Sequence, residues 1–407
     1  MMLRRAHLPF LACVTLAALA APDLAAANLV VENLELVSYG AYDKTLGKFP
    51  ISSRLAFDLS IGGGEKFAGL LRLDFLSTRV ESDLRDLQQS LTAADALQWT
   101  KAERTALLSR INAPGLGLKT VSVSAKRILG FPLEAAYFVG YLDTFCSGDD
   151  FATLFGATPF ATELRGPLRY PKGIKLNPVV SWDGIHAVYG TGARMGLSLN
   201  DRSKVYAYAY QDSDLGAGTW SGDLRALFDL STLKIETFAG GSWDVSHKYG
   251  LYRGGLLFHV APGDMGEFYA QVGVPQYDPK KAFDVNDVFF LFEPRVNFVG
   301  GGGQLALTVF YHPAFYRQKA TGEGGSLDVG FNLRFGRLSD LGMQGGVEAY
   351  LQFRPKESQP LAAEISPYYE AILSGVAWNF KLGLALFPFP TPWFGIFKPF
   401  IGVKTSY

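Results

Sequence analysis

Large apolar side chains alternate with small or polar ones along most of this chain, most clearly near its end. In residues 376–386 every even position is Val, Trp, Phe or Leu, and every odd position is Ala, Asn, Lys or Gly. Successive side chains of a β-strand point to opposite faces, so this segment predicts a strand with one apolar and one polar face. Its length is close to the ~10 residues that a tilted strand needs to cross a bilayer.

The same alternation is repeated in many segments, for example in residues 327–335 and 347–353. One apolar and one mixed face, repeated this often, is typical of a transmembrane barrel. A soluble β-sandwich or propeller is the alternative, but it uses shorter strands around a core. The segments predicted as strands are 33–40, 53–61, 67–77, 119–129, 131–142, 185–199, 203–212, 219–231, 233–242, 249–261, 266–274, 286–298, 303–313, 325–337, 342–354, 376–386 and 401–407.

The direct count of these segments is odd, whereas a closed single-chain barrel with both termini in the periplasm needs an even number of strands. We therefore predict an all-β fold, a transmembrane antiparallel β-barrel of about 16 strands, within a range of roughly 14–18. In this prediction Asn33–Gly40 lies outside the barrel. A separate short strand at Tyr368–Leu373 would instead give about 18 strands.

The connections between the predicted strands alternate between long and short. Outer-membrane barrels have short periplasmic turns and longer external loops, so the long connections are expected to face outside the cell. The long connections are 41–49, 80–116, 143–183, 213–218, 243–248, 275–285 and 314–324, and the short ones are 62–65, 130, 200–202, 232, 262–265, 299–302 and 338–341.

Two segments interrupt the strand pattern. Residues 81–111 have leucines three and four positions apart, and Thr100 with Glu103 forms a capping box, so we expect a helical insert. Residues 143–183 contain Gly, Pro and aromatic residues without a period, so we expect a long folded loop. The sequence leaves open whether these segments plug the lumen or face outside.

The first residues have the features of a secretory signal peptide. Arg4 and Arg5 precede an apolar stretch over 8–21, and 25–27 is a run of alanines suited to cleavage. We therefore expect residues 1–27 to be a signal peptide and residues 28–407 to form the barrel. Only one of the two cysteines lies after residue 27, so no internal disulfide is expected.

The composition narrows the function. The formal net charge is zero, which argues against a nucleic-acid partner. The chain is 14% aromatic and has 45 glycines but only 19% charged residues, which suits a barrel with aromatic belts and tight turns. Neither H-E-x-x-H nor G-x-S-x-G occurs, so we expect no enzyme, no metal and no cofactor.

The last strand carries the most specific motif. Ile401, Val403 and Tyr407 occupy alternate positions before an aromatic C-terminus, although Thr405 is a weaker match. This ending resembles the C-terminal signal of bacterial outer-membrane β-barrel proteins, of the porin-like class. The resemblance implies an outer-membrane location in a diderm bacterium, after signal-peptide cleavage near Ala27. It also implies lipid as a partner and contact with the barrel-assembly machinery through the C-terminal strand.

The mixed face of the predicted strands is expected to line the lumen of this wide barrel. Both charge signs occur there in similar numbers, so strong ion selectivity is not predicted, and a slight anion preference is left open. The residues expected at the lumen are Arg54, Asp58, Arg72, Asp74, Arg194, Arg253, His259, Asp328, Arg334, Glu348, Arg354 and Lys381.

The sequence favours a porin-like channel for passive diffusion of small hydrophilic solutes, gated sterically by the inserted loops. The alternatives are a transporter of hydrophobic ligands such as fatty acids and a closed-lumen surface adhesin or structural barrel. A membrane hydrolase, with His259 as its first candidate residue, comes last. The solute and any homo-oligomeric state are left open.

Overall fold

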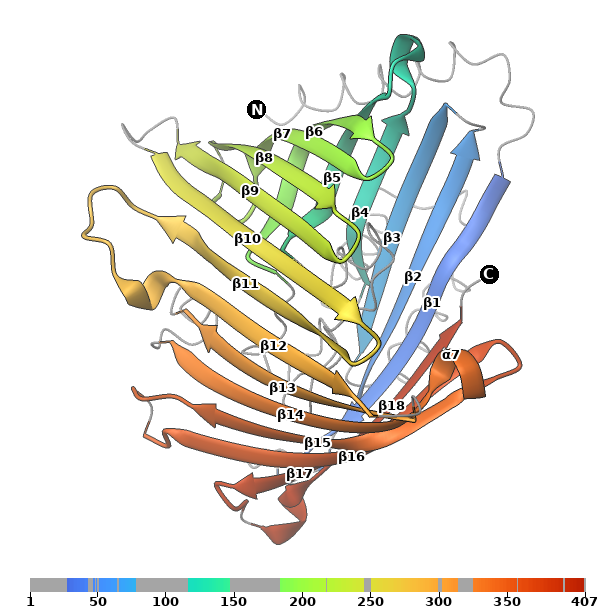
Figure 1. Ribbon diagram of the computed structural model, residues 1–407, viewed down its shortest axis with the longest axis vertical. Coiled ribbons are helices and arrows are strands. Elements are labelled where there is room, and N and C mark those ends of the chain that lie inside the picture. Colours follow the sequence, from blue (N-terminus) through green and yellow to red (C-terminus); the bar gives the residue numbers. More distant parts are fainter. Residues whose placement is uncertain are drawn as a thin grey trace, which may run out of the picture.

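Eighteen antiparallel strands form one closed barrel in the computed structural model (Figure 1). The structure describes residues 28–42, 47, 49, 51–63, 66–77, 116–146, 184–216, 218–244, 250–298, 302–313, 325–356, 358–390 and 392–405. The strands are β1 (Asn28–Gly40), β2 (Ile51–Gly63), β3 (Phe67–Ser77), β4 (Leu116–Ala125), β5 (Leu133–Phe145), β6 (His186–Asn200), β7 (Ser203–Asp212), β8 (Thr219–Asp229), β9 (Leu233–Asp244), β10 (Gly250–Gly263), β11 (Gly266–Tyr277), β12 (Phe289–Asn297), β13 (Gly303–His312), β14 (Ser326–Arg337), β15 (Met343–Phe353), β16 (Leu361–Leu373), β17 (Val376–Phe387) and β18 (Phe397–Thr405).

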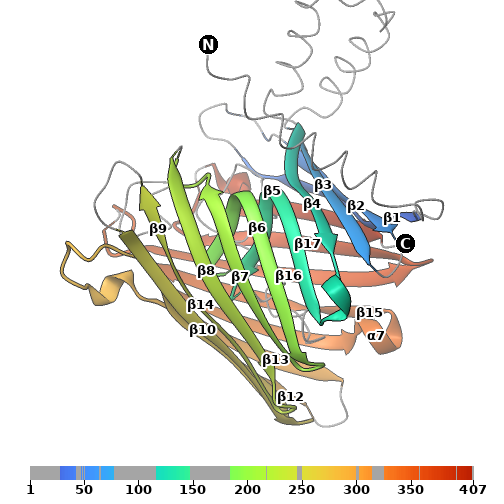
Figure 2. The same cartoon turned by 90° about the horizontal axis from the view of Figure 1, so that it is seen from above.

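Each strand pairs with its neighbours in sequence, and β18 closes the ring by pairing with β1. Leu34 lies opposite Thr405 in this closing pair, and Tyr39 lies opposite Phe400. Closure leaves no sheet edge with unpaired backbone groups, which is the condition for strands to span a membrane. In Figure 2 the green strands β6–β8 stand in front of the orange strands of the opposite wall.

The prediction of about 16 strands is wrong, because both uncertain segments belong to the barrel. Asn33–Gly40 is part of β1, whose inward side chains Val37 and Tyr39 are apolar and buried, so its alternation is weak in sequence. Tyr368–Leu373 is the second half of β16, which begins at Leu361. Pro367 lies inside β16 opposite Val347, and a proline in a strand interior argues against the strand in a sequence reading.

The connections fall into two sets at the two ends of the barrel. One end of the barrel, which we call the turn rim, is formed by the starts of the odd-numbered strands and the ends of the even-numbered strands. The opposite end, the loop rim, is formed by the ends of the odd-numbered strands and the starts of the even-numbered strands. Most of the longer intervals between consecutive strands, such as those after β3 and β5, begin and end at strand ends of the loop rim.

The described helices are short and lie in these connections. They are η2 (Ile128–Gly130), η3 (Val285–Asp287), α7 (Leu338–Leu341) and η4 (Trp393–Ile396). No helix within the described ranges is long and apolar enough to cross a membrane. The expected helical insert at 81–111 lies outside the described residues, as do the signal peptide at 1–27 and residues 147–183 of the predicted long loop. Asp143–Phe145, placed in that loop by the sequence, belong to β5.

The outer face of the barrel is apolar along its height. Leu224, Leu307, Phe331 and Leu382 are mid-strand examples whose side chains are exposed. Exposed aromatic side chains lie near both rims: Phe67, Phe131, Phe298, Phe335 and Tyr369 at the turn rim, and Trp220, Trp243, Tyr252, Phe290, Phe353, Phe387 and Trp393 at the loop rim. An apolar band between two aromatic belts is typical of transmembrane β-barrels.

Candidate functional site: the inner face of the barrel

The inner face is identified by contacts between strands that are not neighbours. The Arg225 guanidinium on β8 donates to the Thr144 carbonyl on β5 across 3.5 Å, and Arg253 on β10 donates to the Tyr210 hydroxyl on β7 across 3.1 Å. Such contacts cross the interior, because the strands between them separate these residues along the wall. Side chains of this set are mostly polar or buried, whereas the alternate set carries the exposed apolar residues.

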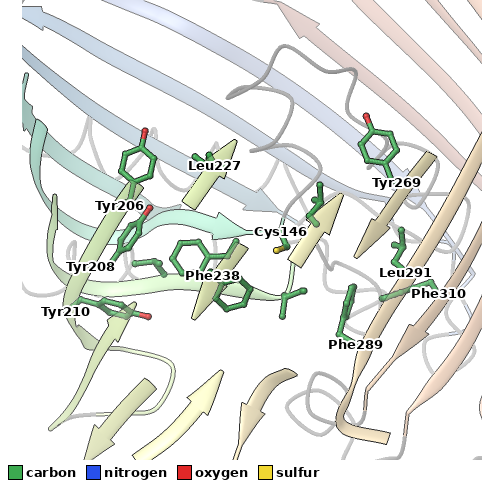
Figure 3. Close-up of a cluster of buried hydrophobic side chains, with 14 of the residues drawn as sticks. Cys146, Tyr206, Tyr208, Tyr210, Leu227, Phe238, Tyr269, Phe289, Leu291 and Phe310 are labelled. Carbon is green, nitrogen blue, oxygen red and sulfur yellow. The ribbon is translucent and has the colours of Figure 1, made fainter. Parts of the chain in front are cut away.

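Part of the inner face is tightly packed, and we call this part the packed sector. It lies on β5–β13, and Figure 3 shows Tyr206, Tyr208 and Tyr210 in one row, with Cys146 and Phe238 near its centre. Aromatic side chains fill this part of the interior, so it is occupied by the wall's own residues. Its members are Phe138, Phe145, Cys146, Ile185, Val188, Tyr206, Tyr208, Tyr210, Leu227, Phe238, Leu257, Tyr269, Phe289, Leu291 and Phe310.

The packed sector also holds Asp223, the centre of a dense hydrogen-bond network near the loop rim. Arg253 donates to both of its carboxylate oxygens, from Nε across 2.7 Å and from Nη2 across 2.8 Å. The Tyr210 hydroxyl donates to Asp223 across 3.0 Å and lies 2.8 Å from His186 Nε2. Arg253 Nη1 also donates to Ser242 Oγ across 2.5 Å. A buried carboxylate is tolerated because its charge is matched and its lone pairs are occupied.

A second buried pair, Arg225–Glu236, ties the end of β5 to the inner wall. Arg225 Nε donates to Glu236 Oε1 across 2.8 Å, and its guanidinium lies 5.2 Å from the centre of the Phe145 ring. The same Glu236 oxygen accepts the Cys146 amide across 2.6 Å, and Gln271 donates to the Cys146 carbonyl across 2.6 Å. Residues on β8, β9 and β11 thus fix the backbone at Cys146 against the inner wall.

A third network lies nearer the turn rim and includes His259. Its Nε2 lies 2.7 Å from Glu267 Oε2, and its ring stacks on Tyr269 at 4.3 Å. Arg295 Nη1 donates to the other oxygen of Glu267 across 2.9 Å, and its Nε donates to Glu293 across 2.9 Å. His259, the first candidate for a catalytic residue, is therefore held in an ionic network of the wall.

The structure places the other residues expected at the lumen on the same inner face, in pairs or small groups. Arg54 lies 3.8 Å from Glu35, and Arg72 lies 3.4 Å from Asp58. Arg194 bridges Asp143 and Glu134, with 2.9 Å to each carboxylate. The side chain of Asp74 lies outside the described residues.

The remaining expected residues gather on β14–β18. Lys381 Nζ lies 2.7 Å from Glu348, and Asn332 donates to the same carboxylate across 3.2 Å. Arg334 donates to Gln304 across 2.6 Å, and Arg354 donates to Gln352 across 2.5 Å. Asp328 lies buried on the same face of β14.

Several residues of these networks were absent from the sequence-based set. Glu293 and Arg295 have the inward parity of their strand, so strand periodicity was sufficient to find them. Glu364 sits on β16, whose first half was not predicted as a strand, and its partner Lys398 starts a strand that was predicted too late. His186 was not singled out, because nothing in the sequence indicates that β6 places it beside Tyr210.

Two of the three residues of the C-terminal motif lie on the outer face. Ile401 is exposed there and pairs with Phe380 of β17 and Ser38 of β1. Val403 has the same parity, and Tyr407 lies outside the described residues. The strand carrying the motif is therefore the one that closes the barrel.

Cys146 provides a test of how tightly the packed sector is closed. Its side chain is buried, and burial together with the nearby Glu236 carboxylate raises the pKa of its thiol. Only the thiolate reacts quickly with maleimides, so we expect Cys146 in the refolded protein to label at least about tenfold more slowly than after denaturation. Mass spectrometry of a chain starting at Asn28 measures both rates.

A matched control places one thiol in the turn between β10 and β11. Met265 is highly exposed, so Cys146→Ser combined with Met265→Cys gives a single thiol that should label at the same rate before and after denaturation. Rapid labelling of Cys146 in the folded barrel would contradict the packing described for this sector.

Within the described ranges, no group of three or more His, Cys, Asp or Glu side chains is arranged to hold a metal ion.

Comparisons with known proteins give matches to solved structures alone. No protein-family model matches the chain, and no curated protein matches it in sequence. A triple mutant of the Rh. blastica porin is similar with a TM-score of 0.47 and 11% identity, over 94% of this chain and 100% of that chain. A double mutant of the same porin is similar with a TM-score of 0.46 and 12% identity, over the same shares. The closed antiparallel barrel, apolar outside and charged inside, confirms the resemblance to porin-like outer-membrane β-barrels at the level of architecture.

Proposed function

We propose that this protein is a porin-like channel of the outer membrane that lets small hydrophilic solutes diffuse passively through the barrel. The observation that carries the proposal is the contrast between its two faces. The outer face is apolar between two aromatic belts, whereas the inner face carries half-buried charged side chains of both signs on β1–β3 and β14–β18. Hydrated ionic side chains can line a path for polar solutes. Placing the same side chains in lipid would cost free energy, because lipid does not hydrate them.

The same architecture supports a proposed orientation and proposed partners. The loop rim would face the outside of the cell and the turn rim the periplasm, as in other outer-membrane barrels. Lipid would cover the outer face, and the barrel-assembly machinery would contact β18, the strand that closes the barrel and carries Ile401 on its outer face. A cleaved signal peptide at residues 1–27 would deliver the chain to this route. We propose no catalytic role for the inner networks.

The hydrophobic-ligand alternative has less support. The packed sector is apolar, but its own aromatic side chains fill it, and Arg225 and Glu236 lie among them. A ligand transporter would need an apolar space that the wall leaves free.

Single-channel recording tests the proposal. A chain starting at Asn28, refolded in detergent and inserted into a planar bilayer, is expected to give stepwise conductance in KCl. Heat-denatured protein is the control for detergent artefacts. Folded, inserted protein that gives no steps would overturn the channel and direct attention to the closed-lumen adhesin or structural barrel.

A further inference from the structure

Charged side chains on the inner face of β14–β18 differ in their exposure. The carboxylates of Asp328, Glu348 and Glu364 are buried, whereas Glu370 on β16 is half-buried. Four cationic side chains in this region are half-buried, and we call Arg334, Arg354, Lys381 and Lys398 the basic strip; Lys404, nearer the turn rim, is exposed.

Two ion pairs show the difference most clearly. Lys381 Nζ lies 2.7 Å from Glu348 Oε2, yet the lysine side chain is 16% exposed and the glutamate 7%. Lys398 Nζ lies 2.5 Å from Glu364 Oε2, with 20% of the lysine side chain and 1% of the glutamate exposed. In both pairs the lysine is the more exposed member.

Local packing holds this order. Gly383 lies opposite Lys398. A Cβ on Gly383 would collide with Glu364 Oε1, so the glycine leaves the space that the buried Glu364 carboxylate occupies. Lys381 lies 5.7 Å from the centre of the Tyr368 ring, which supports an ammonium held above it. Lys381 faces Phe400, two residues from Lys398, so the two lysines are diagonal neighbours on paired strands.

Other inner pairs do not share this order. Arg225–Glu236 and Arg295–Glu293 are buried in both members, so neither charge is presented to a solute. Among the more accessible pairs, Arg72 is more exposed than Asp58, whereas Glu35 is more exposed than Arg54. On β14–β18 the cation is the more exposed member of both ion pairs described above, and the half-buried Glu370 on β16 is bound by Gln344 and Asn379.

We propose that Lys381 and Lys398 are specificity-determining residues that make the channel prefer small anions, such as chloride, over cations. The proposal rests on the channel function proposed above. When two opposite charges lie at different distances from a passing ion, the nearer charge has the larger Coulomb energy with that ion, and added salt weakens both interactions. The basic strip therefore attracts anions although its pairs are formally neutral.

Reversal potentials across a KCl gradient test this inference on the refolded chain starting at Asn28. The unaltered protein is expected to be more permeable to chloride than to potassium. Lys381→Gln with Lys398→Gln should lower the chloride-to-potassium permeability ratio by roughly two- to threefold, and less at 1 M salt than at 0.1 M. Lys381→Arg with Lys398→Arg keeps the charge and should keep the ratio.

The matched control is Lys280→Gln with Lys356→Gln, which removes two lysines from exposed connections of the loop rim. This control should change the chloride-to-potassium permeability ratio much less than Lys381→Gln with Lys398→Gln does. Steps of unchanged selectivity in the Lys381 and Lys398 variant, or a cation-selective unaltered protein, would overturn this inference and leave the channel standing. Absence of steps from inserted protein would overturn the channel and this inference with it.

Discussion

Arg225→Ala is expected to lower the free energy of unfolding by about 3–5 kcal/mol. The substitution removes the guanidinium that neutralises Glu236, and Glu236 has no exposed surface through which water could replace it. It also removes the cation–π contact with Phe145. An uncompensated carboxylate in the interior costs far more than the lost hydrogen bond alone.

Urea unfolding of the protein refolded into lipid vesicles, followed by tryptophan fluorescence, measures this loss. Arg72→Ala is the matched control, because Arg72 is 38% exposed and a solvent-exposed pair contributes only ~0–1 kcal/mol. Arg225→Met with Glu236→Gln removes both charges and leaves an amide oxygen for the Cys146 amide, so it should recover part of the stability. Equal losses for Arg225→Ala and Arg72→Ala would contradict the burial described for this pair.

Phe331→Arg is expected to destabilise the barrel by about 2–4 kcal/mol, because it places a charge at mid-height on the outer face. Phe331 is exposed on β14 and lies between Leu307 and Ala349 of the neighbouring strands. Lipid at this depth cannot hydrate a guanidinium. A soluble β-protein with the same exposed phenylalanine would tolerate the change within ~0.5 kcal/mol.

Phe335→Arg is the matched control on the same strand and face. Phe335 lies near the turn rim, opposite Gly303 and Gly345, where an arginine reaches the interface at a cost of about 0–1 kcal/mol. Urea unfolding in vesicles of defined thickness compares the two variants. Equal cost at the two positions, or none at Phe331, would show that no bilayer covers this face.

The alternation of residues was a good guide to the strands wherever one face is apolar and the other charged. In β14 the odd positions from Leu327 to Phe335 point outward and the even positions from Asp328 to Arg334 point inward. The observed strand has the predicted bounds within a residue or two. The guide was poor where the lumen side is itself apolar, as at Val37 and Tyr39, or where Pro367 interrupts the strand. These two places account for the error in the number of strands.

The alternation of positions along each strand predicted which side chains point inward, but it did not predict which of them contact one another. Parity identified Arg253 as an inward residue, and only the closed barrel brings it to Asp223 on β8 and Tyr210 on β7. The same holds for Glu236, which meets the Cys146 amide from a segment far away in sequence. Hydrogen bonds over such separations depend on curvature and register, and a one-residue shift of a strand would turn these side chains to the outer face.

By itself, the sequence determined that this chain forms a barrel of long antiparallel strands with an apolar and a mixed face, because a period of two in hydrophobicity is a local property of the backbone. Only the tertiary structure decided how many strands close the ring, which inner charges are neutralised in the packed sector, and which lysines of β14–β18 are the more exposed members of ion pairs. Those features arise from contacts between distant segments, and their energies depend on burial, which the order of residues does not contain.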